Sequence, residues 1–126
     1  MSGVPNGPQQ PHDMLPLLPL TPAVFHILLA LADGEKHGYG IMQEVARITD
    51  GGMRMGPGTL YGTIKRMVEA RFIEEIEERP DPQLDDERRR YYRLTNLGNR
   101  VARAEAGRLS ALLGVAKAKR LIGGIS

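Results

Sequence analysis

The strongest constraint on the fold of this chain is a series of three short apolar patterns at helical spacing. Turns separate these patterns, and two extended segments follow them. A first helix is expected after Thr21, whose side chain can cap it, and Asp33-Gly34 should end it. A second helix is expected from about Tyr39 to Thr49, and a third from Pro57 to about Ala70. A glycine-rich turn joins the last two, so the three helices are expected to form one compact unit.

Two extended segments, Phe72 to Glu78 and Arg90 to Thr95, follow the third helix and are expected to pair as a β-hairpin around a polar loop. A long last helix is expected from about Asn96 to Leu121. This order predicts a mainly α fold with a small β-hairpin, namely a winged helix-turn-helix with a long C-terminal dimerisation helix. The predicted parts are a disordered tail over residues 1–13, a winged helix-turn-helix domain over 14–95, and the dimerisation helix and tail over 96–126.

Charge is unevenly distributed along the chain, although the net charge is only +2. Residues 69–87 contain nine acidic and two basic side chains, whereas residues 88–126 contain ten basic and one acidic. Such polarity fits a protein that presents one face to a polyanion. It fits equally well a solvated acidic hairpin beside a solvated basic helix.

Residue content argues against several classes of site. The chain has no cysteine, which excludes disulfides and thiolate metal ligands. The histidines, His12, His26 and His37, have no metal-like spacing with carboxylates, and no hydroxyl or lysine has a convincing base and oxyanion partner. We therefore expect no metal, no cofactor and no enzymatic activity, and we expect His37 to cap a helix or hydrogen-bond locally.

No signal peptide is recognisable, because the N-terminal apolar stretch is interrupted by prolines and no lysine or arginine precedes it. The longest apolar run, Ile27 to Ala32, is far too short to cross a bilayer. A cytoplasmic protein without a membrane partner is expected.

One face of the third predicted helix has a composition that does not favour helix stability. Leu60, Ile64, Met67 and Val68 cluster on one side, since each residue advances ~100° around the axis. The direction opposite this cluster falls on Gly58, Gly62, Lys65, Arg66 and Glu69, with Thr59 and Tyr61 on the flanks. The surface predicted to contact DNA consists of Gly58, Thr59, Gly62, Thr63, Lys65 and Arg66, with Tyr61 at its edge. Two glycines in a helix cost about 1 kcal/mol each relative to alanine.

A helix that enters the DNA major groove benefits from small side chains where its backbone approaches the bases. On this hypothesis the threonines contact base edges, and Lys65 and Arg66 contact phosphate or guanine. The alternative is that Gly58 and Gly62 relieve crowding against a neighbouring helix.

The hairpin and the last helix supply further candidate residues. Arginines on a wing commonly enter a narrow minor groove or contact flanking phosphates, and the candidates are Arg79, Arg88, Arg89 and Arg90. The loop acids Asp81, Asp85, Asp86 and Glu87 could instead hold these arginines in surface ion pairs. On the last helix an apolar side is expected to pair with a second copy of the chain through Leu97, Val101, Leu109, Leu112, Leu113 and Ala116.

Three segments, HGYGIMQEV, GPGTLYGTIKRMVEARFIE and RRRYYRLTNLG, occur in this order across the chain. Together they resemble the PadR family of bacterial transcriptional regulators, and the single terminal helix resembles the family's short subgroup. The resemblance implies a homodimer in which Tyr39 and Tyr61 touch the DNA backbone through their hydroxyls. It also implies that Gly58, Thr59, Thr63 and Lys65 lie in or beside the major groove, with the wing arginines flanking it.

Members of the family typically repress promoters as dimers on inverted repeats, and some respond to small molecules at the dimer interface. Two departures are visible here. Gly62 follows GTLY where the family often has proline, and the chain has no tryptophan to form the indole platform of drug-sensing relatives.

The predicted function is therefore a repressor that binds double-stranded operator DNA as a homodimer. Two alternatives remain open: a winged-helix protein-interaction module whose acidic hairpin engages a basic partner, and a regulator gated by a small-molecule effector in the dimer cleft.

Overall fold

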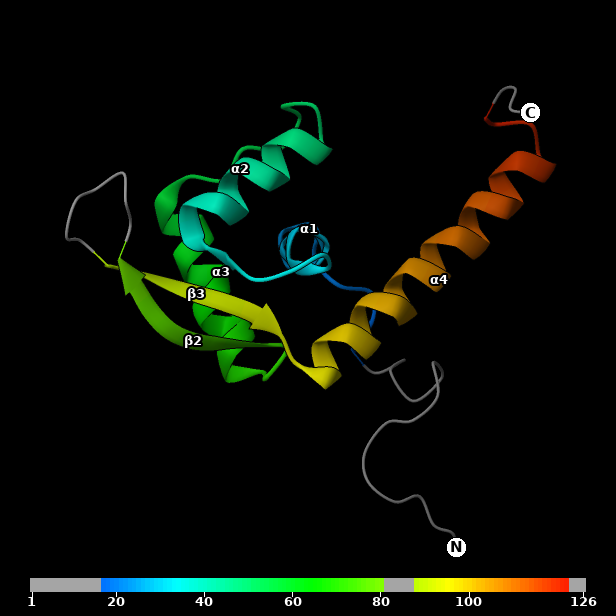
Figure 1. Cartoon of the computed structure of the whole chain (residues 1–126). Coiled ribbons are helices and arrows are strands. Elements are labelled where there is room, and N and C mark those ends of the chain that lie inside the picture. The colour runs from blue at the N-terminus through cyan, green and yellow to red at the C-terminus, as the bar shows by residue number, and fades with distance from the viewer. Residues whose placement is uncertain (1–16, 81–87, 123–126) are drawn as a thin grey trace, which may run out of the picture.

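The computed structural model describes residues 17–80 and 88–122; of residues 77–80, 88 and 89 it describes the backbone only. The elements in chain order are α1 (Pro22–Leu31), β1 (Lys36–His37), α2 (Gly38–Ile48), α3 (Pro57–Glu69), β2 (Ile73–Pro80), β3 (Arg88–Leu94) and α4 (Asn96–Ala118) (Figure 1). This order confirms the predicted winged helix-turn-helix followed by a long helix. The predicted tail, residues 1–13, lies outside the described residues.

Helix α1 occupies the centre of the molecule, between the α2–α3 pair and α4 (Figure 1). Thr21 caps it as predicted, because the Thr21 hydroxyl accepts a hydrogen bond from the Val24 amide at 3.3 Å. Ile27, Leu28 and Leu31 are fully or almost fully buried against α2, α3, α4 and β3. Burying each of these side chains contributes about 1.5–3 kcal/mol. One short helix thus joins all the other helices into one core.

The sheet has three strands in the described part of the chain, in the order β1-β3-β2, where the sequence predicted two. The additional strand is Lys36–His37, which pairs antiparallel with Tyr91 and Tyr92 of β3. Two residues show no alternating pattern, so only the pairing with β3 identifies this strand. β2 and β3 form the predicted wing, with Ile73 opposite Leu94 near its base.

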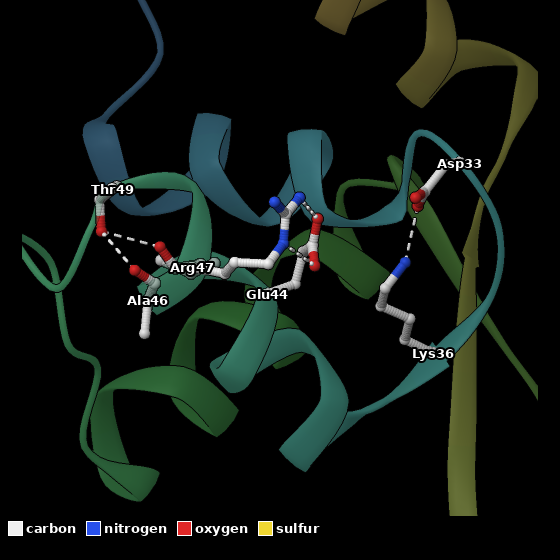
Figure 2. Close-up of polar contacts among 7 residues, drawn as sticks. Asp33, Lys36, Glu44, Ala46, Arg47 and Thr49 are labelled. Carbon is white, nitrogen blue, oxygen red and sulfur yellow. Dashed lines mark hydrogen bonds and ion pairs between the residues drawn. The ribbon is translucent and has the colours of Figure 1, made fainter.

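The turn between α2 and α3 is fixed by one threonine. The Thr49 hydroxyl donates to the carbonyl of Val45 at 2.8 Å and accepts from the amide of Met53 at 3.0 Å. Figure 2 shows this hydroxyl turned back onto the last turn of α2. Asp50 then takes a left-handed conformation with φ of 52°, and Met55 enters the core. These contacts set where α3 begins.

The start of α4 is hydrogen-bonded to the short segment between α3 and β2. The Thr95 amide donates to the Phe72 carbonyl at 3.1 Å, and the Thr95 hydroxyl donates to the Arg71 carbonyl at 2.6 Å. Thr95 also caps α4 by accepting from the Gly98 amide at 2.9 Å. A Cβ atom at Gly98 would overlap the Phe72 carbonyl, so only glycine allows this approach.

The two halves of α4 have different environments. In the first half, Val101 and Ala104 are buried in the core, and Glu105 is only 2% exposed. Glu105 forms a two-pronged ion pair with Arg108, at 2.6 and 2.9 Å, and accepts from the Leu20 amide at 3.2 Å. Beyond Arg108, every α4 residue is exposed except the half-buried Ala116. None of the helices in the described residues is long and apolar enough to span a membrane.

The Gly98 contact predicts a clear stability difference between two glycines of the same helix. Gly98→Ala should lower the free energy of unfolding by about 1–3 kcal/mol, because the new methyl group meets a backbone carbonyl. Gly107→Ala is the matched control: a Cβ there meets no atom within 4 Å, so alanine should stabilise α4 by up to about 1 kcal/mol. Urea unfolding of both variants measures this difference. Equal effects at the two positions would contradict the proposed close approach.

The Glu105 ion pair predicts acid sensitivity. Its hydrogen bonds to the Arg108 guanidinium, with a smaller contribution from the Leu20 amide, hold the pKa of Glu105 below its ordinary value of 4.5. The pair therefore contributes its full stability above about pH 4.5, and this stability is lost as the pH falls through the lower, folded-state pKa.

Glu105→Gln should lower stability by about 1–2 kcal/mol at neutral pH, since a buried charge-assisted hydrogen bond is weakened. Thermal melts between pH 3 and 7 check this. The difference between wild type and variant should shrink at the acid end, and a constant difference across this range would argue against the ion pair.

Candidate nucleic-acid interface

The buried side of α3 includes one residue that was predicted to belong to the DNA-contacting surface. Leu60, Ile64 and Met67 are buried as predicted, but Thr63 is buried as well, at 1% exposure. Thr63 lies only ~60° from Leu60 around the helix axis, within the inward arc. Its hydroxyl is satisfied in the core by donating to the Thr59 carbonyl at 2.7 Å. The prediction that Thr63 belongs to the exposed surface is therefore wrong.

The remaining candidate residues of α3 lie on its solvent side, a surface called here the exposed face of α3. Gly62 is half-buried, and the others are exposed; the set is Gly58, Thr59, Tyr61, Gly62, Lys65 and Arg66. Glu69 is exposed on the last turn of the same helix. The face thus has two cations and an almost bare backbone between them and the helix start.

The two glycines of this face have no packing role among the residues that the structure describes. A Cβ atom at Gly58 would meet no atom within 4 Å, and one at Gly62 would meet only the Arg66 guanidinium nitrogen Nη1 at 3.8 Å. The hypothesis that the glycines relieve crowding against a neighbouring helix therefore has no support in the described residues. Gly62, in the helix interior, costs about 1 kcal/mol relative to alanine, and no contact among these residues offsets that cost.

The N-terminus of α3 lacks the usual side-chain cap. Gly56, the N-cap residue, makes no side-chain cap hydrogen bond, and the first turn contains no acidic residue. These amides and the positive end of the helix dipole are suited to a phosphate. Arg54, which the sequence analysis did not single out, is exposed on the turn just before this point. A cation three residues before a proline-initiated helix is the signal that could have found it.

Two exposed tyrosines lie on α2 and α3. Tyr39, on the first turn of α2, is 48% exposed, and Tyr61 of α3 is 46% exposed. The phenol of Tyr61 covers Gly38 so closely that a Cβ there would collide with it. Tyr61 therefore joins α3 to the start of α2, close in sequence to Tyr39.

His37 stabilises this same corner as the N-cap of α2. Its Nδ1 accepts a hydrogen bond from the Gly40 amide at 3.0 Å, and its ring meets that of Tyr91 edge-on at 5.4 Å between centroids. His26 contacts its own helix, with Nδ1 2.6 Å from the Pro22 carbonyl. In the described part of the chain no three potential metal ligands gather, and His12 lies outside it.

Two cations near the helix-turn-helix are already paired with carboxylates on the surface. Figure 2 shows Arg47 bonded to Glu44 at 2.6 Å and Lys36 bonded to Asp33 at 2.6 Å. The hydrogen bond from Lys36 lowers the pKa of Asp33, and that from Arg47 lowers the pKa of Glu44. Such exposed pairs add little stability, but they compete with any anionic ligand for the same cations.

The wing arginines are only partly described. The backbone register places Arg79 opposite Arg89, but the side chains of Arg79, Arg88 and Arg89 and the whole loop from 81 to 87, with its acids, lie outside the described residues. Arg90 is exposed, with its Nε 3.4 Å from a carboxylate oxygen of Glu75 on β2. Arg93 bonds to Glu74 in the same way at 2.7 Å. Two of the acids that offset this charge thus come from β2, where the sequence analysis considered only the loop.

The candidate dimer residues separate into two groups. Val101 is completely buried in its own core, so the prediction that it faces a partner is wrong, and Leu97 packs partly against the same core. The physical reason is that the first half of α4 lies against α1. Leu109, Leu112 and Leu113 are 39–55% exposed, and Ala116 is half-buried.

Comparison with known proteins identifies the family. The model of the transcriptional regulator PadR-like family matches residues 27–104, which include α2, α3 and the wing. The chain belongs to the PadR family. The resemblance seen in the sequence is thus confirmed, and the family's members are transcriptional regulators rather than enzymes.

Among individual relatives, the transcriptional regulator Rv3488 of Mycobacterium tuberculosis is 37% identical over 101 residues, 80% of this chain and 83% of that protein. An uncharacterized 37.1 kDa protein in transposon TN4556 of Streptomyces fradiae is 34% identical over 88 residues, 70% of this chain but only 23% of that protein. Bacillus subtilis PadR in complex with operator DNA has a similar fold, with a TM-score of 0.58 and 20% identity over 68% of this chain and 46% of that one.

Proposed function

We propose that this PadR-family regulator binds double-stranded operator DNA through the exposed face of α3. The main support for the proposal is the pair of helical glycines, Gly58 and Gly62, which no contact among the described residues requires. A bare backbone at these two positions would let α3 lie deep in the major groove. The complex of Bacillus subtilis PadR with operator DNA supports this use of the fold.

Each part of the surrounding surface has a distinct task in this proposal. The uncapped N-terminus of α3 binds a backbone phosphate through its amides, and Lys65 adds a positive charge on the exposed side. Tyr39 and Tyr61 donate their hydroxyls to the flanking DNA backbone, as the family resemblance implies. Thr59 contacts a base edge, and the wing arginines Arg79, Arg88, Arg89 and Arg90 contact the adjacent minor groove or its phosphates.

The proposed regulator acts as a homodimer. The second half of α4 extends away from the rest of the chain (Figure 1) and has a stripe formed by Leu109, Leu112, Leu113 and Ala116. Large apolar side chains along an extended helix are costly in water, and a second copy of the same stripe covers them by two-fold symmetry. The two α3 helices of such a dimer then contact an inverted repeat with half-sites about 34–36 Å apart. Occupying a promoter in this way represses transcription.

The two alternative hypotheses have less support. A module that used its acidic hairpin to engage a basic partner would need free carboxylates, but Glu74 and Glu75 of β2 already contact arginines of β3. A small-molecule effector at the dimer interface stays a prediction from the family resemblance.

Lys65→Ala should weaken operator binding by about 1 kcal/mol or more and reduce the salt dependence by about one released counterion. Lys117→Ala, an identical change on the exposed end of α4, is the matched control and should leave affinity unchanged. Fluorescence anisotropy with the DNA upstream of the protein's own gene, titrated at several salt concentrations, measures both. We expect a wild-type Kd of about 10⁻⁸–10⁻¹¹ M, and equal affinity for a scrambled duplex would refute sequence-specific binding.

Leu112→Glu should convert the dimer into a monomer, because it places a charge in the middle of the apolar stripe. Ala111 is the neighbour of Leu112 in the sequence but lies on the side of α4 away from the stripe. Ala111→Glu therefore adds the same charge outside the stripe, and this variant should remain dimeric. Sedimentation velocity reports the mass of each. A monomeric wild type, or the same mass for both variants, would rule out dimerisation through this stripe.

A further inference from the structure

We propose that buried Thr63 is a positioning residue that holds the Arg66 guanidinium over Gly62, ready to bind a guanine in the operator. This inference rests on the proposed DNA binding by α3 and assigns its base-specific contact to one side chain. It also gives a new role to Thr63, which the sequence analysis placed in direct contact with DNA.

The hydrogen bonds of Thr63 have only one consistent direction. A hydroxyl has one proton, and the Thr63 proton is donated to the Thr59 carbonyl at 2.7 Å. Its lone pairs are then left as acceptors, and Arg66 donates to one of them from Nη2 at 3.3 Å. Because Thr63 is only 1% exposed, water has little access to compete for this acceptor.

Gly62 provides the space in which Arg66 lies. The Arg66 Nη1 atom is 3.8 Å from the position that a Cβ at Gly62 would occupy, so the guanidinium lies alongside the bare backbone at this point. The Arg66 guanidinium is thus held at one terminal nitrogen by Thr63, and it lies across the exposed face of α3. A guanidinium has five N–H donors, and a single bond to Thr63 leaves the others for a ligand.

This arrangement suits a base contact better than a phosphate contact. Two donors of a guanidinium match the O6 and N7 acceptors of guanine in the major groove, but only if the plane of the fork is correctly oriented. Fixing that plane before binding reduces the entropy lost when the complex forms. Lys65, on the same face, has a point charge that needs no such orientation, and the structure gives it no hydrogen bond or ion pair among the described residues. We therefore assign base discrimination to Arg66 and phosphate attraction to Lys65.

The test compares Thr63→Val, which keeps the shape but removes the hydroxyl, with Thr63→Ser, which keeps the hydroxyl. Affinities are measured for the upstream operator duplex and for a scrambled duplex of the same length. Thr63→Val should lose about three- to tenfold in operator affinity, with scrambled-duplex affinity within about twofold of wild type. Thr63→Ser should retain operator affinity, and melting temperatures confirm that all variants fold.

A double-mutant cycle with Arg66→Ala separates positioning from a general structural effect. If Thr63 acts through Arg66, Thr63→Val should have no further effect in the Arg66→Ala background. Additive losses, an equal loss on both duplexes, or unchanged operator affinity for Thr63→Val would each overturn the proposal.

A DNA-free measurement makes failure of this inference distinguishable from failure of the proposed function. In the free protein, the NMR order parameter of the Arg66 Nε–H group should be high in wild type and Thr63→Ser, and should fall in Thr63→Val. The same mobility in all three would refute the positioning role even if DNA binding is confirmed. A wild type that does not distinguish operator from scrambled DNA would instead refute the proposed function, and with it the guanine contact.

Discussion

The burial of α1 against every other helix is the interaction on which the rest of this structure depends. Ile27, Leu28 and Leu31 offer a compact apolar surface to α2, α3, α4 and β3. Because α3 contributes Leu60 and Ile64 to the same core, its opposite side is held toward solvent. The bare and cationic surface of α3 is therefore a consequence of how this core is packed, and it is presented on a rigid support.

A second constraint couples that surface to the C-terminal helix. Thr95 and Gly98 at the start of α4 contact the backbone that leaves α3, and Glu105 ties the same helix to the N-terminal segment at Leu20. The direction of α4 is thus set relative to α3 by backbone contacts rather than by a flexible linker. In the proposed dimer, this junction would define the distance between the two α3 helices, so operator spacing and α4 packing become linked properties.

The charge pattern was the least reliable guide to function. The acidic stretch suggested a surface for a basic partner, but Glu74 and Glu75 form ion pairs with Arg93 and Arg90 of the neighbouring strand. Glu105 was counted as one acid within a basic helix, yet it is buried in an ion pair with Arg108. Net charge along a sequence cannot show these features, because strand register brings the β2 acids and the β3 arginines together. Glu105 and Arg108 are three residues apart on one helix, and it is the burial of Glu105 that depends on packing.

The sequence by itself determined the helices, the wing, the family and, apart from Thr63, the exposed face of α3, because helical periodicity and turn residues are local signals. The tertiary structure decided what depends on contacts between distant residues: the two-residue strand β1 exists only through its pairing with β3, and Val101 belongs to the core rather than to a partner surface. Thr63 shows the difference most clearly. Its polarity suggested exposure, but the packed core buries it, and its hydroxyl is satisfied by its own helix and by Arg66. Packing and hydrogen bonding decide whether a polar residue at the edge of an apolar stripe is buried or exposed, and sequence periodicity alone does not reveal them.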